Sequence, residues 1–371
     1  MASRWAAAVA AVVLGLTAAG CAPSLERGPA PERESATTRA MVGYLADAVE
    51  LRQFRGAVEV RLGDQVLLRR GFDQARVGAD GVANEPDTRF RIASLTKQFT
   101  ALAVLILQER GRLRVTDAVC THLPDCPPAW RAITVEQLLT HTSGLYDYMD
   151  NSLAEAETFF ARIGTREPSP EQLTEVFARR PLDFAAGARW DYSSSGYVLL
   201  GRIVERLSGS DYGDFLRTEI LDPLGMADSG YEPGLTPDER YAVGYRDWKV
   251  TAETLTDSVY FAGGGMYSTV RDLDRWNQFL MTGDPAVVDG KTLDELLRAR
   301  VEATPLQQYG FGMASRDVDG EPAYFHEGWV AGFTSYNEVQ PATRVSVTVL
   351  SNLDTVDATR IGRGLAAIAR E

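Results

Sequence analysis

A long apolar segment between Arg91 and Gly111 places the strongest constraint on the fold. Drawn as a helix, it carries large apolar side chains around nearly its whole circumference: Leu95, Phe99, Leu102, Leu105, Ile106 and Leu107. A helix that is apolar on all sides must be enclosed by other elements. We therefore expect a buried central helix that ends at Gly111. A chain of 371 residues with 45% hydrophobic content can enclose it as one large domain or as two lobes.

Strand patterns lie near both ends of the chain, and helical patterns lie between them. Residues Gly56–Gly71 alternate apolar and polar side chains around Gly63-Asp64, which predicts a β-hairpin. Strand patterns return at Ser335–Val339 and Arg344–Leu350, before a final helix from about Thr355 to Arg370. The helical patterns between them are Val135–Thr140, Leu153–Ile163, Pro170–Arg179, Gly196–Arg206, Tyr212–Ile220 and a segment that begins at Val270 after the capping residue Thr269.

This order of elements predicts the fold class α/β (α+β). We expect an antiparallel sheet formed from both chain ends and flanked by helices. A mainly helical lobe would be inserted at about residues 117–250. A short strand at Arg89–Ile92 would lead into the central helix.

The N-terminal residues predict export. Residues 1–20 have the form of a signal peptide, with Arg4 before an apolar stretch that is too short and alanine-rich for a membrane span. The sequence Thr17-Ala18-Ala19-Gly20-Cys21 resembles a bacterial lipobox, with Ala18 where Leu is usual. We expect a periplasmic or cell-surface lipoprotein anchored to the membrane at Cys21, or otherwise a secreted protein. Residues 21–38 predict a flexible tether and residues 39–371 the folded domain.

Cys120 and Cys126 are the remaining cysteines, and they lie six residues apart. In an exported protein, this spacing favours a local disulfide, with two free thiols as the alternative. A redox or zinc role is disfavoured because the spacing is not CxxC and only His122 lies near.

Ser94 and Lys97 bring candidate chemistry to the start of the central helix. Residues three apart in a helix share a face, and a desolvated lysine can take the proton of a serine hydroxyl. Other systems are absent: there is no Gly-x-Ser-x-Gly elbow, and His326-Glu327 lacks the second His of a zinc motif. Gly263–Gly265 predicts a tight turn near the cleft rather than a phosphate loop. We expect no metal and no cofactor, and the net charge of −13 disfavours nucleic acid as a partner.

Tyr192-Ser193-Ser194 precedes another apolar helical segment. A tyrosine close to a lysine can exchange protons, whereas the alternative is a tyrosine that caps a helix. Ser94-x-x-Lys97, Tyr192-Ser193-Ser194 and His326-Glu327-Gly328 resemble, in order and spacing, the three motifs of the serine β-lactamase and penicillin-binding-protein superfamily. Further segments resemble its class C and esterase-like branch, and extend the resemblance to about residues 40–365: Phe90–Ser94, Leu138–Leu145, Asp222–Met226 and Ala262–Met266.

The resemblance implies a β-lactamase/transpeptidase-like fold and a role for each motif residue. Ser94 would be the nucleophile that forms an acyl-enzyme, Lys97 the base and proton relay, and Tyr192 a phenolate-like partner. The backbone N–H groups of Ser94 and Trp329 would form the oxyanion hole. The substrate-binding residues would be Ser194, His326, Gly328 and Trp329, and the substrate would be a small molecule or a short peptide.

Two residues depart from the family pattern. Ser194 stands where the second motif usually ends in Asn, and Glu327 stands where the third motif usually has Thr or Ser. An ionised Glu327 beside the pocket would repel the substrate carboxylate that relatives bind. His141 is expected to be structural, and Trp329, Tyr146 and Tyr148 are candidates for the wall of the acyl pocket or for core packing.

The sequence therefore predicts an exported serine hydrolase that cleaves an ester or amide bond through an acyl-enzyme on Ser94. A β-lactamase or D,D-carboxypeptidase is one alternative, disfavoured by Ser194 and Glu327. A penicillin-recognising binding or sensor protein without turnover is another, because the rate of deacylation cannot be read from the sequence.

Overall fold

Strands from the two ends of the chain meet in one antiparallel sheet. The hairpin formed by β1 (Gly56–Leu62) and β2 (Gln65–Phe72) pairs through β1 with β12 (Val345–Ser351), so that Gly56 lies opposite Ser351. The sheet has eight strands in the order β2-β1-β12-β11-β10-β9-β8-β7. The predicted fold class is confirmed. The strands not yet given are β7 Val301–Thr304, β8 Gln307–Tyr309, β9 Ala314–Val318, β10 Glu321–Val330 and β11 Phe333–Gln340, of which sequence analysis found only β11.

The computed structural model describes residues 35–371, except 79–80, 150–166, 234–237 and 253–254. The predicted signal peptide, the lipidation site Cys21 and the helix expected at Leu153–Ile163 lie outside the described residues. Within the described part of the chain, no helix is both long and apolar enough to cross a membrane.

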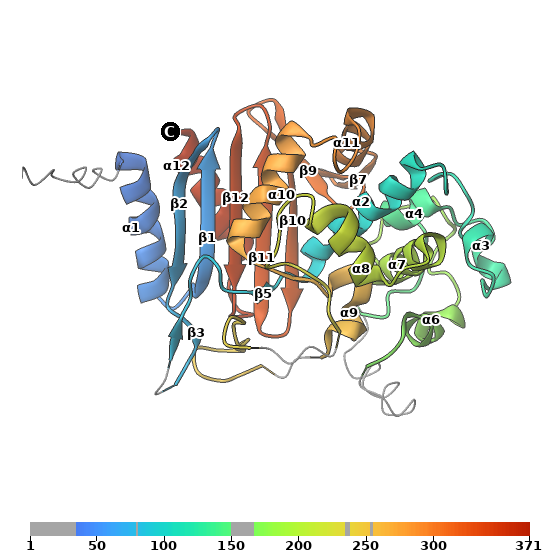
Figure 1. Ribbon diagram of the computed structural model, residues 1–371, viewed down its shortest axis with the longest axis horizontal. Helices are drawn as coiled ribbons and strands as arrows, with labels where there is room; N and C mark the ends of the chain where they lie inside the picture. The colour runs from blue at the N-terminus through green and yellow to red at the C-terminus, as the bar shows by residue number, and fades with distance from the viewer. Residues whose placement is uncertain (1–34, 79–80, 150–166, 234–237, 253–254) are drawn as a thin grey trace, which may run out of the picture. The chain divides into compact units, whose positions relative to one another are not determined.

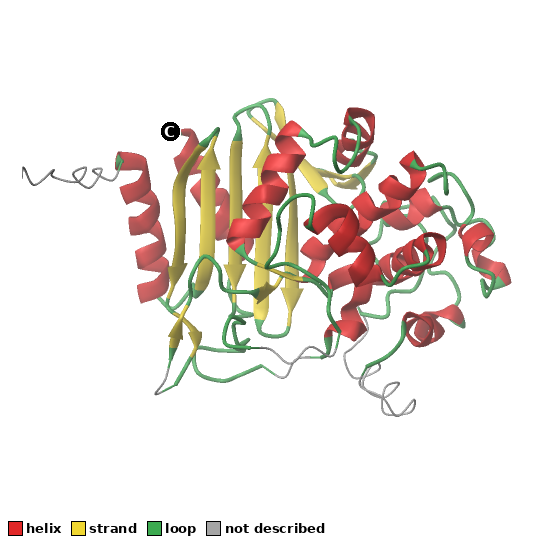
Figure 2. Cartoon of the chain, viewed as in Figure 1, coloured by secondary structure: helices red, strands yellow, loops and turns green. Residues whose placement is uncertain are grey.

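Helices cover both faces of the sheet (Figures 1 and 2). Helices α1 (Ala36–Glu50) and α12 (Ala358–Arg370) pack together on one face, and α10 (Val270–Thr282) crosses the other. Helix α1 begins at Ala36, so it includes the last residues of the expected tether. Its buried residues Met41, Leu45 and Ala48 recur at helical spacing against the sheet, a pattern that sequence analysis missed.

The predicted central helix is confirmed as α2 (Thr96–Glu109), whose residues from Thr96 to Leu107 are all buried. It packs against α7 (Ser194–Ser208), α8 (Tyr212–Leu216), α9 (Asp257–Gly264) and α11 (Gly290–Leu297). The remaining elements are the helices α3 Val119–His122, α4 Val135–Leu139 and α6 Pro170–Ala178, the short helical turns η1 Ala93–Leu95, η2 Pro128–Trp130 and η3 Arg217–Leu221, and the short strands β3 Gln74–Arg76, β4 Val82–Ala83, β5 Phe90–Arg91 and β6 Tyr267–Ser268.

The helical lobe contains the expected disulfide. Cys120 in α3 is bonded to Cys126, with their Cα atoms 5.2 Å apart. Between them, the buried His122 bonds through Nε2 to Asp117 at 3.1 Å, which accounts for this histidine as a structural residue.

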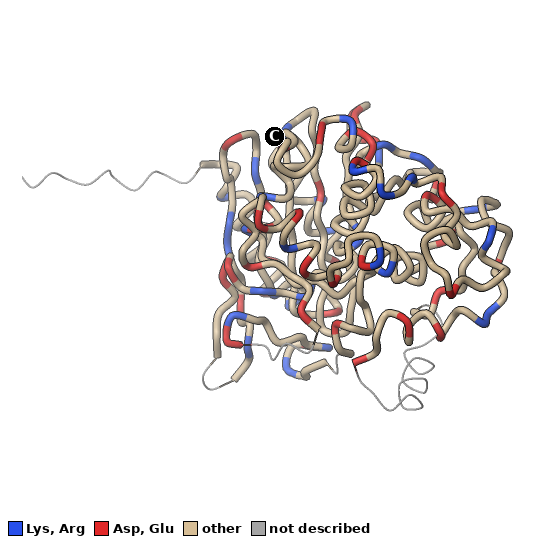
Figure 3. The backbone as a smooth tube through the Cα atoms, turned by 45° about the vertical axis from the view of Figure 1, so that its right-hand side comes forward, with Lys and Arg blue, Asp and Glu red and all other residues tan. Residues whose placement is uncertain are grey.

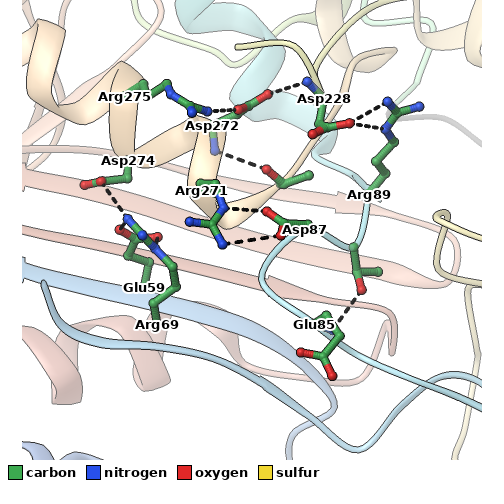
Figure 4. Close-up of polar contacts among 12 residues, drawn as sticks. Glu59, Arg69, Glu85, Asp87, Arg89, Asp228, Arg271, Asp272, Asp274 and Arg275 are labelled. Carbon is green, nitrogen blue, oxygen red and sulfur yellow. Dashed lines mark hydrogen bonds and ion pairs between the residues drawn. The ribbon is translucent and has the colours of Figure 1, made fainter. Parts of the chain in front are cut away.

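A buried group of charged side chains fastens α10 to the hairpin (Figure 4). Arg69 of β2 bonds to Glu59 of β1 and to Asp274 of α10, and Arg61 binds Asp274 at 2.6 Å. Burial raises the pKa of Glu59 to about 8; the charge of Asp274 adds to this, and the bond to Arg69 partly offsets it. Acidic and basic residues are otherwise interspersed along the chain (Figure 3).

Candidate active site

Ser94 lies at the start of the central helix, on the wall of a cavity of about 640 Å³. Strand β5 pairs with β6 and leads into η1, which contains Ser94. The preceding residue, Ala93, has a left-handed φ of +50°, an unfavourable conformation for a residue with a Cβ. Backbone strain of this kind concentrates at functional sites. The expected short strand before Ser94 is confirmed.

Lys97 lies one helical turn after Ser94 and points at it. Its Nζ lies 3.3 Å from Ser94 Oγ and donates a hydrogen bond to the Gly263 carbonyl oxygen at 2.7 Å. Complete burial lowers the pKa of Lys97 to about 7, and the negative charge of Asp147 opposes this shift. A lysine with this pKa is about half neutral at pH 7 and can accept a proton.

Tyr192 lies beside both Ser94 and Lys97, with Lys97 Nζ 4.7 Å from the centre of its ring. Burial raises the pKa of Tyr192, and its hydrogen bond with Ser94 offsets only part of the shift. The free site therefore favours the neutral phenol, and the phenolate expected from the sequence is not supported. The contacts of Tyr192 at the site are its hydrogen bond with Ser94 and the ring contact with Lys97, so its part in proton transfer stays a prediction, and the neutral lysine is the base closest to the serine.

The third motif lies on β10, which packs directly against the segment before Ser94. Gly328 makes this approach possible, because a Cβ there would lie 2.7 Å from the Ile92 carbonyl oxygen and 2.9 Å from Ala93 Cβ. Trp329 follows on the cavity wall. The residue is 56% exposed, and its indole N–H donates to the Asp354 carbonyl oxygen at 3.2 Å. The packing of Gly328 thus brings the Trp329 backbone to the same cavity as Ser94.

His326 is buried, and both of its ring nitrogens are used within the protein. Nδ1 lies 2.5 Å from the Glu327 carbonyl oxygen, an acceptor, so Nδ1 carries the proton. Nε2 then accepts a hydrogen bond from the Tyr309 hydroxyl at 3.0 Å. Burial lowers the pKa of His326 to about 3, and the charge of Lys97 adds to the shift. His326 lines the same cavity as Ser94, so its substrate-binding role stays a prediction, but it is neutral and its ring nitrogens already have partners.

The two residues that depart from the family motifs both lie on the cavity wall. Ser194 is the first residue of α7. Glu327 is exposed, and its Oε2 accepts a hydrogen bond from Thr359 of α12 at 2.7 Å. Asp147 and Asp357 also line the cavity, and the described lining residues include no Lys or Arg. The wall is therefore acidic and lacks the cationic group that would bind a carboxylate.

Sequence reasoning missed two contributions to the site. Asp147 lines the cavity and acts electrostatically on Lys97 and Tyr192. The carbonyl of Gly263 holds the lysine, and this residue lies on the cavity wall at the end of α9, just after a break in the helical backbone at Phe261. The glycine triplet was a usable signal, because glycine permits close approach of a backbone. Nothing in the local sequence marked Asp147.

Of the expected acyl-pocket residues, Trp329 and Tyr148 line the cavity and Tyr146 is not among the lining residues. The Tyr148 hydroxyl donates to the Val259 carbonyl oxygen. No group of three or more His, Cys, Asp or Glu side chains that could hold a metal ion occurs in the part of the chain that the structure describes.

Solved structures with the same fold define the class of protein. The chain superposes on a penicillin-binding protein from Bacillus halodurans with a TM-score of 0.77 and 26% identity, over 88% of this chain and 99% of that one. It superposes on a D-amino acid amidase from Ochrobactrum anthropi with a TM-score of 0.76 and 23% identity, over 91% and 99%, a likeness of fold alone. These superpositions confirm the β-lactamase/transpeptidase fold.

The particular family follows from the sequence. The sequence model of the Beta-lactamase family matches residues 43–370, and the chain belongs to this family of serine hydrolases. It is 34% identical over 254 residues to penicillin-binding protein 4* of Bacillus subtilis, which is 63% of this chain and 54% of that protein. It is 35% identical over 231 residues to esterase EstB of Burkholderia gladioli, covering 57% and 55%. The chain thus spans little more than half the length of these two relatives.

Proposed function

We propose that this protein hydrolyses an ester or amide bond through an acyl-enzyme on Ser94. The observation that carries the proposal is the lysine Nζ 3.3 Å from the serine Oγ, with a pKa of about 7. At neutral pH, a base in the required protonation state lies within reach of the nucleophile's proton.

In the proposed reaction, Lys97 takes the hydroxyl proton as Ser94 Oγ attacks the substrate carbonyl carbon. The backbone N–H groups of Ser94 and Trp329 stabilise the negative oxygen of the tetrahedral intermediate. The proton passes through Lys97 and Tyr192 to the leaving oxygen or nitrogen, and the bond to that atom breaks. A water then attacks the acyl carbonyl carbon and gives one proton to Lys97. The bond from the acyl carbon to Ser94 Oγ breaks, and Lys97 passes that proton to Oγ, which releases the acid and restores Ser94 and the neutral lysine.

The charges of the cavity support a substrate without a carboxylate beside the scissile bond. His326 is neutral, and the cavity wall carries Asp147, Glu327 and Asp357. A substrate carboxylate there would meet like charges and no counterion. The esterase relative named above supports an ester as the substrate.

Two experiments test the proposal. A fluorophosphonate should label the wild-type protein on Ser94, and Ser94→Ala should lose both the label and all hydrolysis of p-nitrophenyl esters. In a matched series of esters, kcat/KM should be lower for the member with a terminal carboxylate than for its uncharged analogue. Glu327→Thr should recover part of that loss in kcat/KM, which corresponds to no more than about 1–3 kcal/mol of transition-state binding. Equal rates for both esters, unchanged by Glu327→Thr, would contradict the proposed substrate charge.

The penicillin-binding relatives favour a second candidate, a protein that β-lactams acylate but that turns them over slowly. Intact-protein mass spectrometry after exposure to a β-lactam separates the outcomes. A lasting adduct on Ser94 indicates trapping, a transient adduct with product release indicates a β-lactamase, and no adduct supports the ester or amide proposal.

We further propose that the protein is exported and anchored by a lipid on Cys21. The local disulfide supports an oxidising compartment. Globomycin, which blocks lipoprotein processing, should cause an unprocessed precursor to accumulate, and normal processing under the drug would argue for simple secretion.

A further inference from the structure

We propose that His141 is a positioning residue that holds Tyr192 in place against Lys97. His141 follows α4 closely and is 1% exposed. Its carbonyl oxygen accepts a hydrogen bond from the Asp191 N–H at 2.9 Å. Its ring Nδ1 accepts one from the Ser193 N–H at 3.1 Å. One residue therefore holds the backbone on both sides of Tyr192.

The ring of His141 also contacts the tyrosine itself. The His141 and Tyr192 ring centres lie 4.3 Å apart, and Tyr309 and Tyr197 pack against the same histidine at 4.7 and 5.2 Å. The imidazole thus supports Tyr192 through its backbone and its side chain together. This role deepens the proposed function, on which it rests, because Tyr192 matters for proton transfer only if Ser94 and Lys97 react as proposed.

The hydrogen bonding excludes His141 as the catalytic base. Because Nδ1 accepts a backbone N–H, the ring proton lies on Nε2. Nε2 is buried and has no hydrogen-bond partner among the described residues, and it is not on the cavity wall. Burial lowers the pKa of His141 well below its ordinary value, and the charges of Lys97 and His326 add to the shift. The ring therefore stays neutral and does not gain a proton during the reaction.

Few side chains satisfy the requirements of this position. The backbone of His141 has a left-handed φ of +57°, which Asn, Asp and His tolerate better than most residues. The side chain must also place an acceptor one bond beyond Cγ to receive the Ser193 N–H. An unpaired buried Nε2–H is unfavourable, so packing alone would favour an apolar ring here. The hydrogen bond that Nδ1 accepts from the Ser193 N–H, next to Tyr192, explains why this position has a histidine rather than an apolar ring.

Asparagine and glutamine variants separate positioning from packing. In His141→Asn, the amide Oδ1 can occupy the place of Nδ1 and the left-handed backbone remains accessible. In His141→Gln, the amide lies one bond further out and the acceptor beside Ser193 is lost. We expect the asparagine variant to retain kcat within about threefold and the glutamine variant to lose about 100-fold, the loss that a misplaced catalytic group typically produces. KM should stay within about threefold in both, because His141 is not on the cavity wall.

The readouts are steady-state hydrolysis of an uncharged p-nitrophenyl ester and the rate of fluorophosphonate labelling at Ser94, with far-UV circular dichroism as the folding control. His141→Ala removes the acceptor without adding bulk, so it remains a test even if the glutamine variant does not fold. The proposal requires that the alanine variant show the same loss of kcat. Equal activity of the asparagine and glutamine variants would overturn the proposal. So would a loss that appears mainly in KM. Labelling of wild-type protein at another residue would instead refute the proposed function and leave the contacts of His141 unexplained by it.

Discussion

The buried lysine should make the protein less stable than it would be with an apolar residue at the same position. Burial lowers the pKa of Lys97 from 10.5 to about 7. Since one pKa unit corresponds to about 1.4 kcal/mol, the charged form costs roughly 5 kcal/mol in the folded state. We therefore predict that Lys97→Met, which is one atom shorter and carries no charge, abolishes activity but stabilises the fold at pH 6.

The sign of the pH dependence follows from the two pKa values. Between the folded-state value of about 7 and the unfolded value near 10.5, the unfolded chain binds the extra proton, so the free energy of unfolding rises with pH. From pH 6 to pH 9, Lys97 should add about 3 kcal/mol to the stability of the wild-type protein. The methionine variant lacks this increment.

The assay is urea denaturation of both proteins at pH 6 and pH 9, with the disulfide intact. The methionine variant also loses the hydrogen bond to Gly263 O. This loss is the same at both pH values, so it cancels when the change in unfolding free energy from pH 6 to pH 9 is compared between the two proteins. Titrating groups that do not interact with Lys97, such as Glu59, also cancel because both proteins contain them. An identical change in unfolding free energy between the two pH values in both proteins would refute the argument, because Lys97 would then not titrate in this range.

Three further predictions concern the pH profile, the third motif and the disulfide. The kcat/KM for an uncharged ester should fall below an apparent pKa near 7 as Lys97 gains its proton, and Lys97→Arg should be nearly inactive; a limb near pH 4 would contradict the role of Lys97. Gly328→Ala should abolish fluorophosphonate labelling because its Cβ would lie 2.4 Å from Ser335 Oγ, whereas Gly290→Ala, with no atom within 4 Å, should label normally. Cys120→Ser should lower the unfolding free energy by about 2 kcal/mol, and an unchanged value would show that Cys120 and Cys126 are not linked in the wild-type protein.

The sequence predicted the parts of the fold that have a strong local pattern. The central helix was recognisable because it is apolar on all sides, and the hairpin because its strands alternate around a two-residue turn. Strands β7–β10 were missed because they are short or contain polar residues that the sheet buries through long-range contacts. Ser315 and His326, for example, are both buried there. No periodicity within one segment reveals which polar residues a distant segment will cover.

The candidate site shows the same division. Ser94, Lys97 and Tyr192 were found as motifs, and the structure brings their side chains together. The protonation states could not be predicted, because they depend on burial and on groups from other elements. Desolvation makes Lys97 a base and keeps Tyr192 a neutral phenol. Both ring nitrogens of His326 form hydrogen bonds, one with Tyr309 of β8 and one with the Glu327 carbonyl oxygen of β10.

The pairing of β1 with β12 has a consequence for how the chain folds. The strand that contains Gly56 finds its partner only when the segment that contains Ser351 is available, so almost the whole chain must be synthesised before the sheet can close. Contacts between segments this distant in sequence form slowly, because the intervening chain must first lose much of its conformational freedom. Until then, the edge of the β1–β2 hairpin stays open to pairing with other chains. A fold closed this late depends on protection from aggregation until β12 arrives.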